Sequence, residues 1–134
     1  QLQRKEEIMG NRNSIVIQEE LGAYGVDPNP LYLYSHWHGQ ELDQVVATAL
    51  NRGRSRRNDS AYLTRIIVSD LLREDLDGTT GFGISQIPQD HDDYNHMIFI
   101  NFMIHGLEIR RNGITYTLEE FVTEFSDVAK EAIT

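Results

Sequence analysis

The chain has 134 residues, of which 40% are hydrophobic and 25% charged, a composition typical of one globular domain. It contains no cysteine, which excludes disulfides, thiol nucleophiles and cysteine-ligated metals. Its 21 acidic and 12 basic side chains give a net charge of −9, which opposes general binding to a nucleic-acid backbone. The sequence shows neither an apolar run of about 18 residues nor a signal segment, so we expect a cytoplasmic protein that does not contact membranes.

The first half of the chain predicts two strands followed by two helices. Residues 1–12 are polar and are predicted to form an N-terminal extension. The runs 14–18 and 31–36 are rich in β-branched and aromatic residues, and a connection rich in Gly, Pro and Asn joins them. Apolar residues then recur at helical spacing over 40–52, where Gly53 is expected to be a left-handed C-cap. A second helix is predicted to begin at a cap on Asp59 or Ser60.

The second half predicts four strands and a closing helix. Strands are expected at 81–85, 97–102, 107–110 and 114–116, with Asn112-Gly113 as the turn of a hairpin. Thr117 and Glu120 form a capping box at the start of the helix. Grouped helices and short turns favour an α+β fold, a two-layer sandwich in which an antiparallel sheet of about five to six strands packs with a helix pair and a C-terminal helix. Residues 1–134 are predicted to form a single domain.

Lysine is scarce, and this excludes several enzyme classes. Lys5 and Lys130 are the only lysines, and both lie near the ends of the sequence. A P-loop needs a lysine after its glycines, and a Schiff-base enzyme needs a desolvated lysine. The sequence also lacks the common motifs of serine hydrolases and zinc proteases, so we assign no catalytic residue, no cofactor and no metal.

Four arginines in six residues stand out in this acidic chain. Arg52, Arg54, Arg56 and Arg57 fall at the turn between the two predicted helices. Guanidinium groups match phosphate and carboxylate geometry, so the cluster is a candidate site for a small phosphorylated ligand. The alternative is a solvated loop whose arginines pair with surface acids. Tyr62 lies nearby in the sequence and could stack on a nucleobase, although strand and helix aromatics more often serve packing.

Arg65 is placed by helical spacing on one face with Ala61, Val68 and Leu72. A cation on an apolar face is costly unless it is satisfied, so we expect a partner for it. The partner could be structural, with Asp43, Asp59 and Asp70 as candidates, or it could be a ligand phosphate or carboxylate.

Two further segments are candidates for ligand contacts. His36, Trp37 and His38 lie between a predicted strand and a predicted helix, a place that favours an anion and offers one stacking ring. Either histidine could instead act as a general base, and a metal site with His91 and His96 is a weaker alternative. Gly81, Gly83 and Ser85 would line one strand face with little bulk, so a ligand, a helix or a bulge could approach the backbone closely.

The pattern Tyr32-Leu33-Tyr34-Ser35-His36-Trp37-x-Gly39, Tyr62-Leu63-x-Arg65-Ile66-Ile67 and Gly81-Phe82-Gly83-Ile84-Ser85 resembles a family of short, mostly uncharacterised phage, prophage and bacterial proteins. The resemblance covers about residues 13 to 102 and implies a phage-associated accessory protein. Small phage proteins include oligomers that sequester nucleotide signals of bacterial immunity, and this analogy fits a local arginine patch beside aromatics.

Three functions therefore remain open from the sequence. The first is a homo-oligomeric anti-defence protein that sequesters a phosphorylated nucleotide of the cyclic ADP-ribose or cyclic oligonucleotide type. The second is an acidic protein-interaction inhibitor or structural module, which the charge of −9 favours. The third is a phosphodiesterase that cleaves such a nucleotide.

Overall fold

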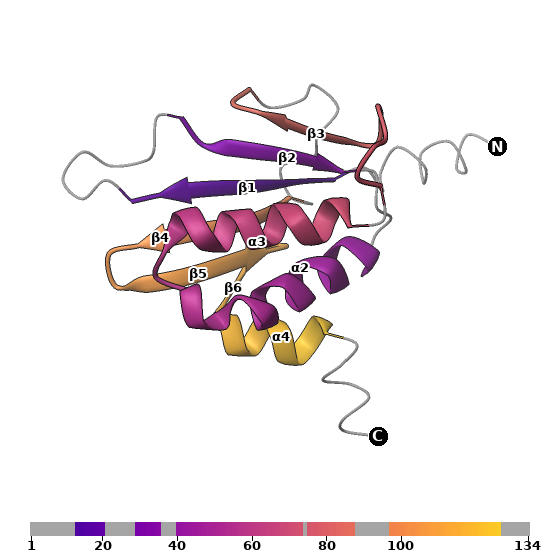
Figure 1. The fold of residues 1–134 in the computed structure, drawn as a ribbon. Helices are drawn as coiled ribbons and strands as arrows, with labels where there is room; N and C mark the ends of the chain where they lie inside the picture. Colours follow the sequence, from indigo (N-terminus) through magenta and orange to yellow (C-terminus); the bar gives the residue numbers. More distant parts are fainter. Residues whose placement is uncertain (1–12, 21–28, 36–39, 74, 88–96, 127–134) are drawn as a thin grey trace, which may run out of the picture.

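The computed structural model describes residues 13–20, 29–35, 40–73, 75–87 and 97–126. Its elements, in chain order, are β1 (Asn13–Glu19), β2 (Leu31–Ser35), α2 (Gln40–Arg52), the 3-10 turn η2 (Arg54–Arg56), α3 (Ser60–Leu72), β3 (Phe82–Ser85), β4 (Ile98–Met103), β5 (Gly106–Arg111), β6 (Ile114–Tyr116) and α4 (Leu118–Phe125). The described helices lie together on one face of a six-stranded sheet (Figure 1). The predicted α+β two-layer architecture is therefore confirmed.

The sheet is mixed rather than fully antiparallel. Its strand order is β3-β2-β1-β4-β5-β6. Four neighbouring pairs are antiparallel, whereas β1 and β4 pair in parallel, with Ile15 opposite Ile98 and Ile17 opposite Ile100. Short turns predict only antiparallel neighbours, but β1 and β4 are far apart in sequence and are not joined by such a turn. β3 and β6 form the two edges.

Alternation along the strands places the main core between the sheet and the helices. Ile15, Leu33, Ile98, Ile100 and Ile109 point from the sheet toward the helices and are fully buried. Leu42, Val46, Ala49 and Leu50 of α2, Leu63 and Ile67 of α3, and Leu118 and Phe121 of α4 complete this core. Within the described ranges, no helix combines the length and apolar character needed to cross a bilayer.

Two predicted local signals are present in the structure. Asn112 and Gly113 both have positive φ, 53° and 79°, as expected for the two-residue turn that joins β5 and β6. At the start of α4, Thr117 Oγ1 accepts a hydrogen bond from the Glu120 N–H at 3.1 Å, and Glu120 Oε1 accepts one from the Thr117 N–H at 2.8 Å. The predicted capping box therefore begins this helix.

The predicted left-handed cap at Gly53 is wrong. Its φ is −95° and its ψ is 13°, a conformation open to any residue. Glycine is favoured there by close packing, because a Cβ would lie 2.7 Å from Leu63 Cδ1 and 3.3 Å from the Ala49 carbonyl oxygen. The absence of a side chain at this turn lets α3 pack tightly against the end of α2.

Candidate functional site

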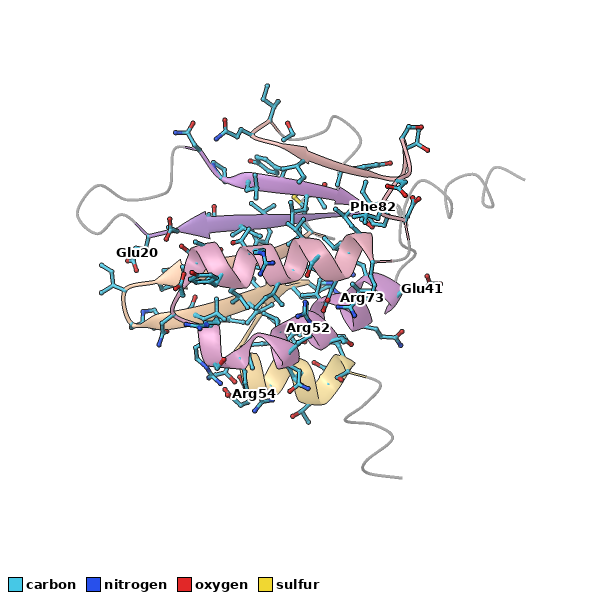
Figure 2. All side chains as sticks on the ribbon, viewed as in Figure 1. Glu20, Glu41, Arg52, Arg54, Arg73 and Phe82 are labelled. Carbon is cyan, nitrogen blue, oxygen red and sulfur yellow. The ribbon has the colours of Figure 1, made fainter. Side chains whose placement is uncertain are left out.

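The first arginine of the turn holds the two long helices together. Arg52 Nη2 donates to Asp70 Oδ1 at 2.8 Å and to Ser69 Oγ at 2.9 Å, which connects α2 to α3. Arg73 reaches the same carboxylate. In Figure 2 the Arg52 and Arg73 side chains lie near each other, between the two helices. The Asp70 side chain is only 7% exposed, so these two cations neutralise a nearly buried charge.

Arg54 and Arg57 are also engaged by the protein itself. Arg54 Nη2 donates to Asn51 Oδ1 at 2.7 Å. Arg57 forms an ion pair with Glu119 of α4 and donates from Nε to the Arg54 carbonyl at 3.2 Å. The hydrogen bond from Arg57 lowers the pKa of the Glu119 carboxyl below its usual value. These contacts join the turn to α4, as the solvated-loop alternative predicts.

Arg56, Tyr62 and Arg65 form a different surface, which we call the arginine–tyrosine face. The Arg56 guanidinium carbon lies 5.1 Å from the centre of the Tyr62 ring, a cation–π contact. Tyr62 is 53% exposed. Arg65 follows Tyr62 by one helical turn and is exposed. Among the described residues, neither arginine of this face has a carboxylate partner.

The expected partner of Arg65 is not found among the described residues. Asp43 pairs with Arg111, Asp70 pairs with Arg52 and Arg73, and Asp59 accepts a hydrogen bond from the Tyr62 N–H as the N-cap of α3. All three structural candidates are thus engaged elsewhere. Arg65 is exposed, so water can solvate its charge without a structural carboxylate, and a ligand phosphate or carboxylate stays a prediction.

The remaining described candidates lie near the other end of α3. Gly81 is buried and has a φ of 97°, so its backbone conformation alone favours glycine. Gly83 pairs with Tyr34, and Ser85 Oγ accepts a hydrogen bond from the Ile87 N–H at 2.9 Å. Figure 2 shows Phe82 beside the end of α3 and Arg54 below the helices, near α4. A helix of 13 residues spans about 20 Å, so the Arg56–Tyr62 contact at the start of α3 lies far from the β3 glycines. Arg65 lies between them and lines a hollow with Val68 and Leu72, two residues that also line the cavity beside Gly83.

His36, Trp37 and His38 lie outside the described residues, as do His91 and His96. In the part of the chain that the structure describes, no group of three His, Asp or Glu side chains is arranged to hold a metal ion.

Two features near the core were missed by the sequence reasoning. Arg111 Nε donates to Asp43 Oδ1 at 2.9 Å in a buried ion pair. A cavity of about 240 Å³ lies between β2, β3, the end of α3 and the turn that follows it. Strand alternation places Arg111 on the helix-facing side with Ile109, so a buried cation could have been suspected. The cavity depends on how β3 meets α3, which no local pattern encodes.

No family model matches the chain, and neither a curated protein nor a solved structure matches it.

Proposed function

We propose that the protein binds a small phosphorylated ligand that carries a nucleobase, at the arginine–tyrosine face. The observation that supports this most directly is the Arg56 guanidinium over a half-exposed Tyr62 ring, with the exposed Arg65 one turn further along α3. Exposed guanidinium groups without carboxylate partners suit phosphate oxygens, and the tyrosine ring suits a base.

The arginines of this region differ in their contacts: some bind groups of the protein itself, and others are available to a ligand. Arg52 and Arg57 form ion pairs within the protein, and Arg54 is held by Asn51. Among the described residues, the Arg56 and Arg65 guanidinium groups have neither an ion pair nor a hydrogen bond, so all their donors are available to a ligand, whereas Arg54 uses one Nη2 donor on Asn51. The net charge of −9 would repel a long polyanion, so a compact nucleotide fits better than DNA or RNA.

Within this proposal, the ligand is a nucleotide signal of bacterial immunity, of the cyclic ADP-ribose or cyclic oligonucleotide type. The protein would sequester it in the cytoplasm of a phage-infected bacterium and so antagonise defence. A homo-oligomer would add depth to the site, because an exposed face becomes a pocket when a second subunit closes over it.

A thermal-shift screen against cyclic ADP-ribose, cyclic dinucleotides and cyclic trinucleotides tests the proposal. We expect at least one nucleotide to raise the melting temperature of the native protein. The double variant Arg56→Gln/Arg65→Gln should lose this shift, because each charge-assisted hydrogen bond contributes about 1.5–3 kcal/mol. Arg110→Gln is the matched control, since Arg110 is an exposed arginine on the sheet face away from the helices. Equal shifts in all three proteins would refute the site.

Recovery of the ligand separates sequestration from cleavage. A sequestering protein returns the nucleotide intact after heat denaturation, whereas a phosphodiesterase returns a linear or dephosphorylated product. Chromatography of the released nucleotide distinguishes the two. If a product appears, His36→Ala and His38→Ala variants would show whether either histidine transfers the proton.

A further inference from the structure

Among the described strands, β3 has a neighbour on one side only, so its other side can accept an additional strand. β3 pairs with β2 on one side and is the terminal strand of the sheet order, so no strand among the described residues pairs with its other side. Its sequence, Phe82-Gly83-Ile84-Ser85, has no proline and no charged residue. Proteins commonly protect such edges with charge or proline, and β3 has neither device.

The position of Gly83 indicates which backbone groups face outward. A Cβ built on Gly83 would lie 3.8 Å from the Cβ of its partner Tyr34. Such close spacing is typical of a non-hydrogen-bonded antiparallel pair, in which each residue turns its N–H and C=O away from the other strand. The N–H and C=O of Gly83 therefore point toward the open edge, and those of Ser85 follow by alternation.

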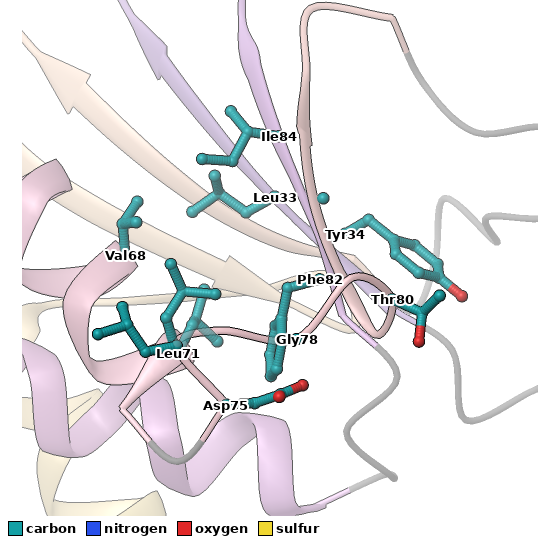
Figure 3. A pocket seen from close by; sticks show the side chains of 12 residues that line it. Leu33, Tyr34, Val68, Leu71, Asp75, Gly78, Thr80, Phe82 and Ile84 are labelled. Atoms are coloured by element: carbon teal, nitrogen blue, oxygen red, sulfur yellow. The ribbon is translucent and has the colours of Figure 1, made fainter.

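An apolar cavity opens beside this edge (Figure 3). Its volume is about 240 Å³, and its lining includes Val68, Leu71, Leu72, Leu76, Phe82 and Ile84. Leu76 is 76% exposed and Ile84 is 60% exposed. Small-molecule sites usually measure about 300–1,000 Å³, so this smaller hollow better fits one large apolar side chain.

The carboxylates near the cavity favour a positively charged binding partner. Asp75 lines the cavity, and Asp77 is exposed two residues further along the same turn; neither carboxylate forms an ion pair with a described residue. Two cations lie on the neighbouring hollow along α3: Arg73, which pairs with Asp70, and Arg65. A second copy of this chain would bring the same carboxylates and another net charge of −9 to the edge. A basic peptide would meet opposite charge.

We propose that an extended segment of a basic partner protein binds here by adding a strand to β3. Its backbone would hydrogen-bond to Gly83 and Ser85, one of its apolar side chains would fill the cavity, and flanking Lys or Arg would lie near Asp75 and Asp77. This mode of recognition combines main-chain hydrogen bonds with a side-chain pocket. Arg56 separates it from the nucleotide proposal, because the Arg56–Tyr62 contact lies near the other end of α3, whereas Arg65 lines a hollow that adjoins the cavity.

The test is an NMR titration of the ¹⁵N,¹³C-labelled full chain with synthetic heptapeptides. The first probe is acetyl-Lys-Thr-Val-Leu-Val-Thr-Lys-amide, and its matched controls replace both Lys by Glu or the central Leu by Ala. We expect the first probe to give saturable shifts of the Gly83 and Ser85 amides and of the Leu76 and Ile84 methyl groups. Each control should bind at least about tenfold more weakly, and added NaCl should weaken the first probe.

Two pairs of variants make the test specific. Gly83→Pro removes one outward N–H, and its φ is not in the positive range, so the strand should persist while binding is lost. Gly83→Ala keeps the N–H and should bind normally.

Ile84→Lys places a cation in the groove and should abolish binding. Ile104→Lys changes another exposed isoleucine, in the β4–β5 turn, and should not affect binding. Absence of shifts at β3, or equal binding by Gly83→Pro, would overturn the proposal, and Arg56→Gln should leave peptide binding unchanged.

Discussion

Arg111 of β5 donates a hydrogen bond to Asp43 of α2 at 2.9 Å, and the two side chains are only 7% and 6% exposed. The pair connects the sheet to the helix layer through the core. Burial raises the pKa of the Asp43 carboxyl above its usual value, whereas the charge and hydrogen bond of Arg111 oppose this rise. Each member thus compensates the desolvation of the other.

Removing one member of this pair should be strongly destabilising. We expect Arg111→Met to lower the free energy of unfolding by about 3–5 kcal/mol, because it leaves the Asp43 carboxylate buried without its cation. Urea unfolding near neutral pH measures this loss. The double variant Arg111→Met/Asp43→Leu removes both charges and should recover most of the stability. A double variant as unstable as the single one would contradict this explanation.

The loss of stability in Arg111→Met should depend on pH in a direction that can be predicted. Without Arg111 the pKa of Asp43 rises further in the folded state, because the influences that lower it are lost. A carboxyl whose pKa is raised by folding contributes stability when protonated and loses that contribution as pH rises through the folded-state pKa. The stability deficit of Arg111→Met should therefore grow from about pH 4 to about pH 7. A stability deficit that shrinks between these two pH values would contradict this explanation.

Tyr116 should make the protein sensitive to alkali. Its pKa is raised from 10.0 to about 12, first by burial and then by a hydrogen bond and charge from Glu124. The unfolded chain loses the phenol proton near 10, so wild-type stability should fall from pH 10 toward pH 12. Tyr116→Phe preserves the ring contacts with Phe121 and Phe125 and should show a smaller fall. Identical stability curves for the two proteins would show that the Tyr116 phenol does not contribute.

Gly53→Ala should be destabilising for steric reasons. The new methyl group would collide with Leu63, a fully buried core residue, and would crowd the Ala49 carbonyl. Overpacking of this kind costs about 1–3 kcal/mol. Gly83→Ala is the control, because its methyl would meet only Tyr34 Cβ at an ordinary 3.8 Å. Equal thermal stability of the two variants would refute the packing role of Gly53.

Local patterns predicted much of this fold because several elements carry their own signals. The Asn112-Gly113 turn, the capping box at Thr117 and the cap at Asp59 each depend on side chains within four residues, and all three are present. The parallel pairing of β1 with β4 depends on residues more than 80 positions apart. Patterns of alternation identify such strands but do not specify their neighbours.

The candidate site was harder to predict because the arginines look alike in the sequence. Arg52 and Arg56 lie four positions apart, yet Arg52 pairs with Asp70 and Arg56 stacks on Tyr62. The two arginines differ because α3 packs against α2, which brings Asp70 within reach of Arg52 at the end of α2. For Arg65, helical spacing identified its neighbours on α3 but did not reveal that this side chain is exposed.

The structure therefore predicts different effects for neighbouring arginines. Arg52→Gln should lower the free energy of unfolding by about 1 kcal/mol, because it removes the hydrogen bonds to Ser69 and Asp70 from a partly exposed site. It should leave nucleotide affinity unchanged once the folded fraction is corrected. Denaturation and calorimetric titration of the same preparation measure both quantities. Loss of affinity in folded Arg52→Gln would place this arginine in the binding site.

The most direct measurement for the nucleotide proposal is isothermal titration calorimetry with the nucleotide that gives the largest thermal shift. The native protein, Arg56→Gln/Arg65→Gln and Arg110→Gln would be compared at one salt concentration. We predict that the double variant binds at least about a hundredfold more weakly, since each lost charge-assisted contact weakens binding about tenfold or more. Arg110→Gln should bind like the native protein. Native affinity in a folded double variant would contradict the proposed role of the arginine–tyrosine face.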